Sequence, residues 1–189
     1  AKPTWKEVVP GDLKYKDWNG DGIIDNNDSA PFGYTNIPEI TLGMNLGFSY
    51  RNIDFSAFFH AALNRNVYLD ASYYKAFQNN GSVSEFALNR WTSDETAHTA
   101  TYPRLSLTNE QNNYRTSTFW MRNGNFLKLR DVEVGYTFKN IIPATKADLR
   151  VFVNGTNLFA VDNVDGYDSE RIGGYPAVRT VSLGANIQF

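Results

Sequence analysis

The chain has 189 residues, of which 42% are hydrophobic and 15% aromatic, which is enough to bury a sizeable core and too apolar for a disordered tail. Its net charge is −2, and Lys and Arg are spread along the chain rather than clustered, so nucleic acid is not an expected partner. The absence of cysteine excludes a disulfide framework, a thiolate metal site and a thiol nucleophile.

Residues 1–37 contain the run DWNGDGIIDNND, which follows the calcium-loop pattern D-x-[DN]-x-[DN]-G. Oxygen ligands at alternate positions let a short backbone wrap a hard cation, and Gly22 permits the sharp turn. The expected ligands are Asp17, Asn19, Asp21, the carbonyl of Ile23, Asp25 and Asp28. Asp28 stands where such loops usually place a glutamate, so its shorter arm requires a tighter loop. The run over 17–28 therefore predicts one structural Ca²⁺, and the alternative is a turn without an ion.

Strict alternation of apolar and polar residues begins at Pro38 and continues to Tyr50. Such a period is typical of a strand with two unlike faces. Arg51 and Asn52 then form a tight turn, and alternation resumes over 53–63. The two segments predict a β-hairpin.

Residues 64–118 lose this order and are rich in Asn, Ser, Thr and Tyr, so we expect a long loop. Alternation returns over 119–138 but changes phase, because Leu127 has the opposite parity to Val132. We therefore expect a β-bulge or phase change near Arg130.

A short connection at 139–147 leads to a fourth strand at 148–161, and a second polar loop at 162–176 leads to the last strand, 177–189. The acidic residues of this second loop are Asp162, Asp165, Asp168 and Glu170. Their spacing fits no ligand pattern, so we expect a solvated loop.

Strand length and loop length together favour a membrane barrel. Four of the five expected strands have roughly 11–14 residues and the segment 119–138 is longer, against ~5–6 in globular sheets and ~9–11 for a tilted membrane strand. Their connections alternate short and long, as periplasmic turns and extracellular loops do. With the C-terminus in the periplasm, both long loops and residues 1–37 lie outside the cell. The mean hydropathy of −0.44 agrees, because lumen-facing polar residues offset lipid-facing ones.

We therefore predict an all-β fold, in which residues 38–189 form a transmembrane antiparallel β-barrel segment in the bacterial outer membrane and residues 1–37 an extracellular loop. Four aromatic residues would gather as a girdle at the periplasmic interface: Tyr50, Tyr136, Phe138 and Phe189. A soluble β-sandwich with one solvated face would show the same alternation.

No arrangement in the sequence supports catalysis. There is no Ser/His/Asp pattern, no phosphate-binding glycine loop and no carboxylate pair placed for acid–base work, so we do not expect an enzyme. His60 and His98 lie far apart and are expected to be ordinary surface or lumen residues.

The last strand ends on Phe189, with apolar residues at the third, fifth, seventh and ninth positions counted back from it. This pattern looks like the C-terminal signal that the barrel-assembly machinery recognises. A buried last strand of a soluble protein can also end in Phe.

Seven segments, in order and over nearly the whole chain, resemble the C-terminal barrel region of SusC/RagA-like TonB-dependent transporters. They are PGDLKYKDWNGDGIIDNNDSAPFG, TLGMNLGFSYRNIDFSAFFHAA, NRWT, FWMRNGNFLKLRDVEVGYTF, RVFVNGTNLF, GYDSE and YPAVRTVSLGANIQF. The resemblance implies about the last five strands of a 22-stranded barrel around an N-terminal plug. It also implies a SusD-like lipoprotein over the extracellular mouth, energy from TonB, and import of oligosaccharides or peptides.

Five strands cannot close a barrel, and a membrane tolerates no open sheet edge, so the other strands and the plug must come from the same or a separate chain. The aromatic residues expected to contact the lipoprotein are Trp5, Trp18, Tyr73, Tyr74 and Trp91. One alternative is a secreted, calcium-containing, carbohydrate-binding β-sandwich. A dockerin-like adhesion module is weaker, because dockerins need two calcium loops and this chain has one.

Overall fold

The computed structural model describes residues 1–70, 72–107, 112–143, 145–164, 166–171 and 174–189. Two compact units are present. Unit 1 comprises Ala1–Gly33 and Tyr68–Met121, and unit 2 comprises Tyr34–Val67 and Arg122–Phe189. No helix in the described part of the chain is long and apolar enough to cross a membrane.

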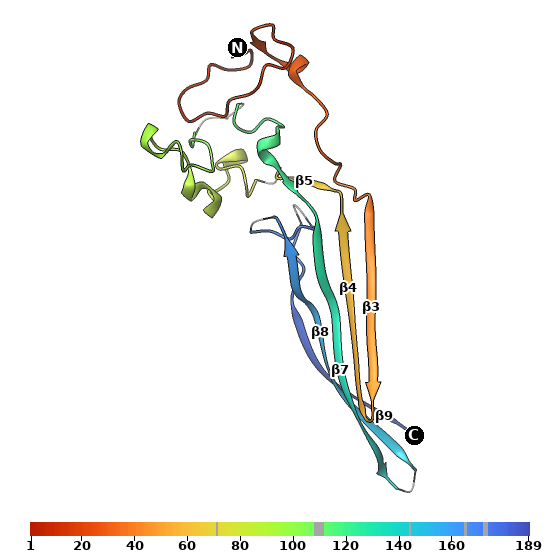
Figure 1. The fold of residues 1–189 in the computed structure, drawn as a ribbon. Helices are drawn as coiled ribbons and strands as arrows, with labels where there is room; N and C mark the ends of the chain where they lie inside the picture. Colours follow the sequence, from red (N-terminus) through yellow and green to blue (C-terminus); the bar gives the residue numbers. More distant parts are fainter. Residues whose placement is uncertain (71, 108–111, 144, 165, 172–173) are drawn as a thin grey trace. The chain divides into compact units, whose positions relative to one another are not determined.

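Unit 2 is built on a five-stranded antiparallel sheet with strand order β3-β4-β7-β8-β9 (Figure 1). The strands are β3 (Ile40–Tyr50), β4 (Ile53–Leu63), β7 (Phe126–Ile142), β8 (Ala147–Asp162) and β9 (Thr180–Gln188). They contain 9 to 17 residues, which exceeds the typical strand of a globular sheet and suffices for a tilted membrane strand. The five predicted strands are therefore present, and β4 has the predicted bounds. The expected start of the third strand at residue 119 is wrong, because the 3-10 helix η5 (Thr118–Trp120) and the short strand β6 (Met121–Asn123) precede β7, which begins at Phe126.

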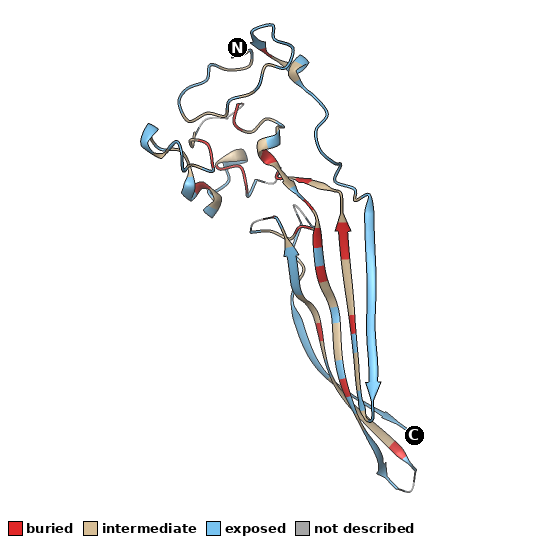
Figure 2. Cartoon of the chain, in the orientation of Figure 1, coloured by how far each residue is buried: buried red, intermediate tan, exposed pale blue. Residues whose placement is uncertain are grey.

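One face of the sheet is apolar on every strand. Side chains alternate between faces along a strand, so the pairing register carries each row across the whole sheet. The central row consists of Leu46, Ala57, Val132, Gly155 and Val181, each paired with the next. The neighbouring row consists of Phe48, Phe55, Val134, Val153 and Leu183. Because β3 is exposed along its entire length (Figure 2), its apolar side chains have no cover within the chain.

The opposite face is mainly polar and carries the charged side chains of the strands. Residues on it include Asn45, Asp54, Lys128, Asn154 and Ser182. The other sheets in the described ranges are the pairs β1 (Lys2–Pro3) with β2 (Ile23–Ile24) and β5 (Asn66–Tyr68) with β6 (Met121–Asn123). Both are too small to cover an apolar face of this size. The sheet has the two unlike faces of a barrel wall, whereas a β-sandwich buries its apolar face under a second sheet.

The expected phase change in β7 is confirmed. The pairing of β7 with β4 shifts between Phe58 and Phe59, and its pairing with β8 shifts between Leu129 and Asp131. The extra residue on β7 is Arg130, and on β8 the extra residues include Asn157, whose φ of 52° is left-handed. The bulge places the apolar residues before and after it on the same face.

The predicted connection at 139–147 is wrong in length. Strand β7 continues to Ile142 and β8 begins at Ala147, and these two residues pair across an irregular stretch. Pro143 then ends the pairing because it has no amide hydrogen to donate. In the irregular stretch, Asn140 has a left-handed φ of 54°. Its backbone amide donates to the Asp148 carboxylate at 2.8 Å.

The aromatic residues expected in a girdle lie at one end of the sheet. Tyr50 pairs with Ile53, which pairs with Tyr136, so both tyrosines stand level on the apolar face. The rings of Tyr136 and Phe138 are 4.7 Å apart. Because the strands are antiparallel, the long connections after β4 and β8 both leave from the other end.

Unit 1 is a packed body with little regular structure. Besides β1 and β2 it contains the 3-10 helices η1 (Asn26–Asp28), η2 (Gln78–Asn80), η3 (Glu85–Asn89), η4 (Asp94–Thr96) and η5 (Thr118–Trp120). Its core is aromatic, since Tyr74, Tyr102 and Trp120 are buried and the Tyr102 hydroxyl donates to the Tyr74 carbonyl at 2.7 Å. The described residues of 64–118 contain no long strand, as expected, but most of them belong to unit 1 and share its core.

Candidate functional site: the polar face and the calcium-type loop

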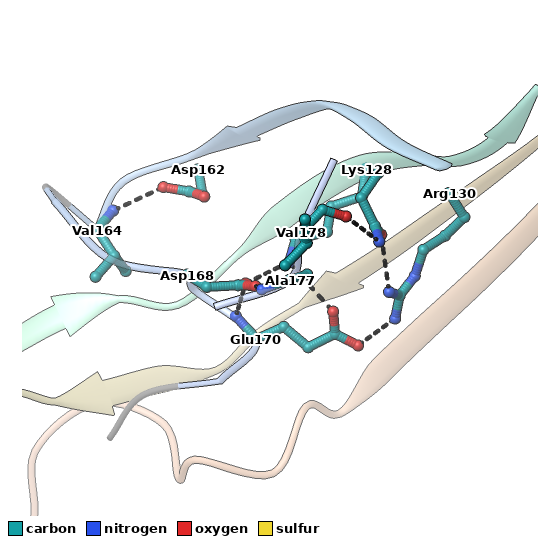
Figure 3. A network of polar contacts seen from close by, with 9 residues as sticks. Lys128, Arg130, Asp162, Val164, Asp168, Glu170, Ala177 and Val178 are labelled. Atoms are coloured by element: carbon teal, nitrogen blue, oxygen red, sulfur yellow. Dashed lines mark hydrogen bonds and ion pairs between the residues drawn. The ribbon is translucent and has the colours of Figure 1, made fainter. Parts of the chain in front are cut away.

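A buried ion-pair network lies on the polar face of the sheet, where the segment after β8 folds back against β7 (Figure 3). The ammonium group of Lys128 contacts the Asp168 carboxylate and lies 3.2 Å from Glu170. Glu170 also pairs with Arg130. The side chains of Lys128 and Asp168 are only 6% and 7% exposed, so the pair is almost fully removed from water. We call these four residues the loop latch.

Two backbone amides later in the same segment support the charge of Asp168. The carboxylate accepts hydrogen bonds from the amides of Glu170 at 3.0 Å and Ala177 at 2.9 Å. Burial alone would raise the pKa of Asp168, but the hydrogen bond from Lys128 and these amides outweigh it and hold the pKa below its ordinary value. Asp168 is therefore an anion at neutral pH.

The expectation that the acidic residues of this loop are solvated is wrong for Asp168 and Glu170. Their partners come from β7, about forty positions earlier in the chain, and no local spacing reveals such a pairing. Asp162 accepts a hydrogen bond from the amide of Val164 at 3.1 Å, and Asp165 lies outside the described residues.

A second ion cluster lies further along the same face, toward the β7–β8 turn. Arg150 on β8 pairs with Asp54 on β4 and, at 2.6 Å, with Glu133 on β7. Gly135 is on β7, between β4 and β8. A side chain at that position would overlap the Arg150 guanidinium and the Asp54 carboxylate. The cluster thus joins three strands across a position that only glycine leaves open.

His60 lies on the polar face opposite Lys128, and its ring meets the edge of Phe126 at 5.4 Å. His98 is exposed in unit 1. The two histidines are in different units, which agrees with their interpretation as ordinary lumen and surface residues.

The predicted calcium-type loop, residues 17–28, has a continuous set of side-chain to backbone hydrogen bonds. Asp17 accepts from the amides of Gly20 at 2.6 Å and Gly22 at 2.9 Å. Asp28, at the other end, accepts from the amides of Trp18 at 2.7 Å and Asp25 at 2.9 Å. Asp17 thus closes the glycine turn, and Asp28 connects the end of the loop to its beginning.

The other expected ligands of the loop also make local interactions. Ile23, which would offer its carbonyl to an ion, lies in β2, and Asp25 caps η1 by accepting from the amide of Asn27 at 2.7 Å. The side-chain amide of Asn19 donates to the Asp21 carboxylate at 2.9 Å. The amide of Asp25 lowers the pKa of Asp28 most, so this carboxyl is an anion at neutral pH.

The donor set of the loop fits a hard cation. Carboxylate, amide and carbonyl oxygens are what Ca²⁺ takes, and a carboxylate oxygen that accepts one amide hydrogen keeps a second lone pair. In the described ranges, however, no three acidic or histidine side chains stand grouped as metal ligands. The carboxylates are turned to the backbone amides instead.

Sequence reasoning missed two buried asparagines that organise unit 1. Asn112 accepts from the Trp5 indole at 3.0 Å and donates to the Leu13 carbonyl at 2.9 Å. Asn113 accepts from the Leu13 amide at 2.8 Å and donates to Asp12 at 2.9 Å. Neither side chain has a periodic or motif signal, because its partners lie about a hundred positions away in the sequence.

Only some of the aromatic residues expected at a protein contact are on the surface. Trp18 is 59% exposed and Tyr73 is 40% exposed, whereas Trp5 and Trp91 are partly buried. Tyr74 is buried in the core of unit 1, so its expected role as a surface contact is wrong. Packing against Phe86, at 4.9 Å between rings, explains its burial.

A long two-faced sheet with an uncovered apolar side and an ion-paired polar side defines a segment of an outer-membrane β-barrel wall. Comparison with known proteins agrees. The chain is 29% identical to TonB-dependent receptor P26 of Formosa agariphila, over 96% of this chain and 20% of that protein. It is 30% identical to TonB-dependent receptor SusC of Bacteroides thetaiotaomicron, over 95% of this chain and 18% of that protein. No family model matches the chain.

Solved structures show the same fold. The RagAB peptide importer in its closed-closed state superposes with a TM-score of 0.68 at 22% identity, over 97% of this chain and 21% of that one. The RagAB peptide transporter gives 0.68 over 88% of this chain and 19% of that one. The chain is thus a SusC/RagA-like segment of a TonB-dependent receptor, located in the bacterial outer membrane, and it spans about a fifth of the length of the curated relatives it matches.

Proposed function

We propose that the chain forms part of the wall of a TonB-dependent outer-membrane importer, together with further strands and a plug from the same or a separate polypeptide. The observation that carries this proposal is the two-faced sheet. Its apolar face suits contact with lipid, and its polar face, with two ion clusters, suits a water-filled interior. The relatives are named TonB-dependent receptors, which supports TonB as the proposed source of energy.

The proposed cargo is an oligosaccharide or a peptide. The similar solved structures are described as peptide importers, which favours peptides for those proteins. The proposal includes a SusD-like lipoprotein over the extracellular mouth, and the exposed Trp18 and Tyr73 are its proposed contacts, because aromatic side chains are enriched in protein interfaces. The barrel-assembly machinery is a further proposed partner, through strand β9.

Deleting the complete receptor from its host tests this proposal. Uptake of a fluorescently labelled tryptic digest and of labelled malto-oligosaccharides is measured with and without the receptor, in the presence and absence of TonB. We expect that uptake of either the peptides or the malto-oligosaccharides is lost, both in the receptor mutant and in the TonB mutant. Unchanged uptake of both cargos would refute import of either class.

The proposed lipoprotein partner is tested separately, by purification of the complete receptor in detergent. We expect a lipoprotein to copurify with it, and Trp18→Ser with Tyr73→Ser to weaken that association. The control is Tyr175→Ser, which removes a still more exposed aromatic residue from unit 2. Equal effects of the two sets of changes would contradict the assigned contacts.

We also propose that residues 17–28 bind one structural Ca²⁺ through Asp17, Asn19, Asp21, the Ile23 carbonyl, Asp25 and Asp28. The closed set of hydrogen bonds within the loop supports this, because an ion would need little rearrangement of the backbone. The ion would hold the turn together and would supply no chemistry to cargo.

Calorimetry on the complete receptor tests the calcium proposal. We expect one site with a dissociation constant of about 10⁻⁴–10⁻³ M, as in extracellular modules, and a loss of about tenfold or more on Asp17→Asn because ligand charge sets the affinity. Glu7→Gln is the matched control, since it removes one exposed charge from the same unit outside the loop. Absence of calcium uptake at millimolar concentration would end the proposal.

A further inference from the structure

The segment between β8 and β9, described at 163–164, 166–171 and 174–179, is held against the polar face of the sheet by Asp168 and Glu170. Lys128, which holds it, is on that face because it pairs with His60, and His60 pairs with Gly43 in the polar row of β3. Within the segment, Val164 and Ser169 are buried, at 4% and 0% exposure. A loop that only extended beyond the end of the strands would not bury these residues or reach Lys128.

The β-bulge provides a second attachment for the same segment. Arg130, the extra residue of β7, pairs with Glu170 and donates to the Asn157 side chain at 3.2 Å. Asn157, from the bulged part of β8, donates to the Val178 carbonyl at 3.3 Å. The segment is thus fixed before and after its exposed part, at Asp168–Glu170 and at Ala177–Val178 (Figure 3).

In a barrel whose apolar face contacts lipid, the polar face lines the interior. We propose that residues 166–171 and 174–179 belong to an inward-folded loop that narrows the cargo path, and that Lys128 is the positioning residue that holds this loop in place. This inference rests on the proposed import function. Tyr175, which is 78% exposed and lies between the two attachments, is the side chain that the loop offers to cargo. An aromatic ring can stack on a sugar ring or pack against peptide side chains.

The buried charges make the attachment two-state. Separating Lys128 from Asp168 without hydrating them would leave two charges in a medium of low dielectric, so the loop either stays closed with the pair intact or opens and exposes both. Removing one partner leaves the other buried without its principal counter-charge and favours opening. Lys128→Gln therefore raises the population of the open loop, whereas Arg150→Gln, which breaks the ion cluster elsewhere on the same face, does not.

Opening is measured with Ser169→Cys in the complete purified receptor, with any cysteine elsewhere in that protein replaced. This chain has no cysteine, and residue 169 is inaccessible while the loop is closed. When closure is fast, maleimide labelling follows the equilibrium population of the open state. Lys128→Gln should raise the labelling rate at least about tenfold, whereas Arg150→Gln should leave it unchanged. If Ser169→Cys is labelled at the same rate with and without Lys128→Gln, whether fast or slow, Lys128 does not hold the loop and the proposal is overturned.

Contact with cargo is measured with Tyr175→Cys in the same receptor. A tryptic digest and a malto-oligosaccharide mixture are each added before the maleimide. The cargo that the receptor imports should slow labelling of Tyr175→Cys but not of Thr145→Cys, an exposed position in the turn between β7 and β8 at the other end of the sheet. Import without protection at 175 would overturn the role of the loop and leave the import proposal standing. Absence of import would defeat the proposed function, and labelling at 169 would still report whether the loop is attached.

Discussion

Leu46 gives the sharpest test of which face of the sheet contacts lipid. It is the seventh of the eleven residues of β3, with its side chain on the apolar face. At a rise of ~3.4 Å per residue and a tilt of ~45°, β3 spans about 24 Å of depth, close to the ~25 Å apolar band of an outer-membrane barrel. Leu46 then lies about 2 Å from the centre of that band. Leu46→Arg should cost about 2–4 kcal/mol.

The neighbouring residue supplies the control, because Asn45 has the same depth and the opposite face. Asn45→Arg should cost little. Ile187→Arg, on the apolar face but level with Phe138 near the end of the sheet, should cost about 0–1 kcal/mol. The folded fraction of the complete receptor is followed by heat-modifiable gel migration through a guanidinium titration. Equal losses for Leu46→Arg and Asn45→Arg would refute the assignment of faces.

Two further predictions concern the polar face. Asp168→Asn should cost about 2 kcal/mol at pH 7, less than the ~3–5 for a fully broken buried pair, since Glu170 still contacts Lys128. Because the folded-state pKa of Asp168 is lowered, its contribution is fully present above the unfolded pKa near 3.9 and is lost as pH falls through the folded value. The difference in thermal stability between wild type and variant should therefore begin to shrink below about pH 4 and close below the folded-state pKa. Gly184→Ala would overlap the ring of Phe152 across the strand pair and should cost about 1–3 kcal/mol in the same guanidinium assay, whereas the exposed Ser182→Ala should be nearly neutral. A persistent difference at low pH, or equal costs at 184 and 182, would contradict these two arguments.

Strands were predictable where one face is uniformly apolar. The alternation from Ile53 to Leu63 specified β4 to the residue, and the change of parity between Leu127 and Val132 located the bulge. The end of β7 was not predictable, because Lys139 and Asn140 interrupt the alternation while the backbone continues to pair up to Ile142. Backbone pairing does not require an amphipathic pattern, so polarity alone ends a strand too early.

The candidate sites divide in the same way. The loop at 17–28 was visible because its partners are close in sequence, and its hydrogen bonds join residues within the same run. The loop latch and the Asn112–Asn113 network join residues that are tens of positions apart. Single side chains carry no signal of such contacts, and the acidic residues near Asp168 therefore looked like an ordinary solvated surface.

The bulge at Arg130 also affects how strands are counted in related sequences. A method that seeks unbroken alternation ends a strand at Arg130 and starts another at Val132, although β7 is one strand from Phe126 to Ile142. One extra crossing reverses the assigned direction of every segment before it. Residues 17–28 would then be assigned to the periplasm and the aromatic end of β3 to the cell surface. Topology assignment in such barrels therefore depends on a single inserted residue.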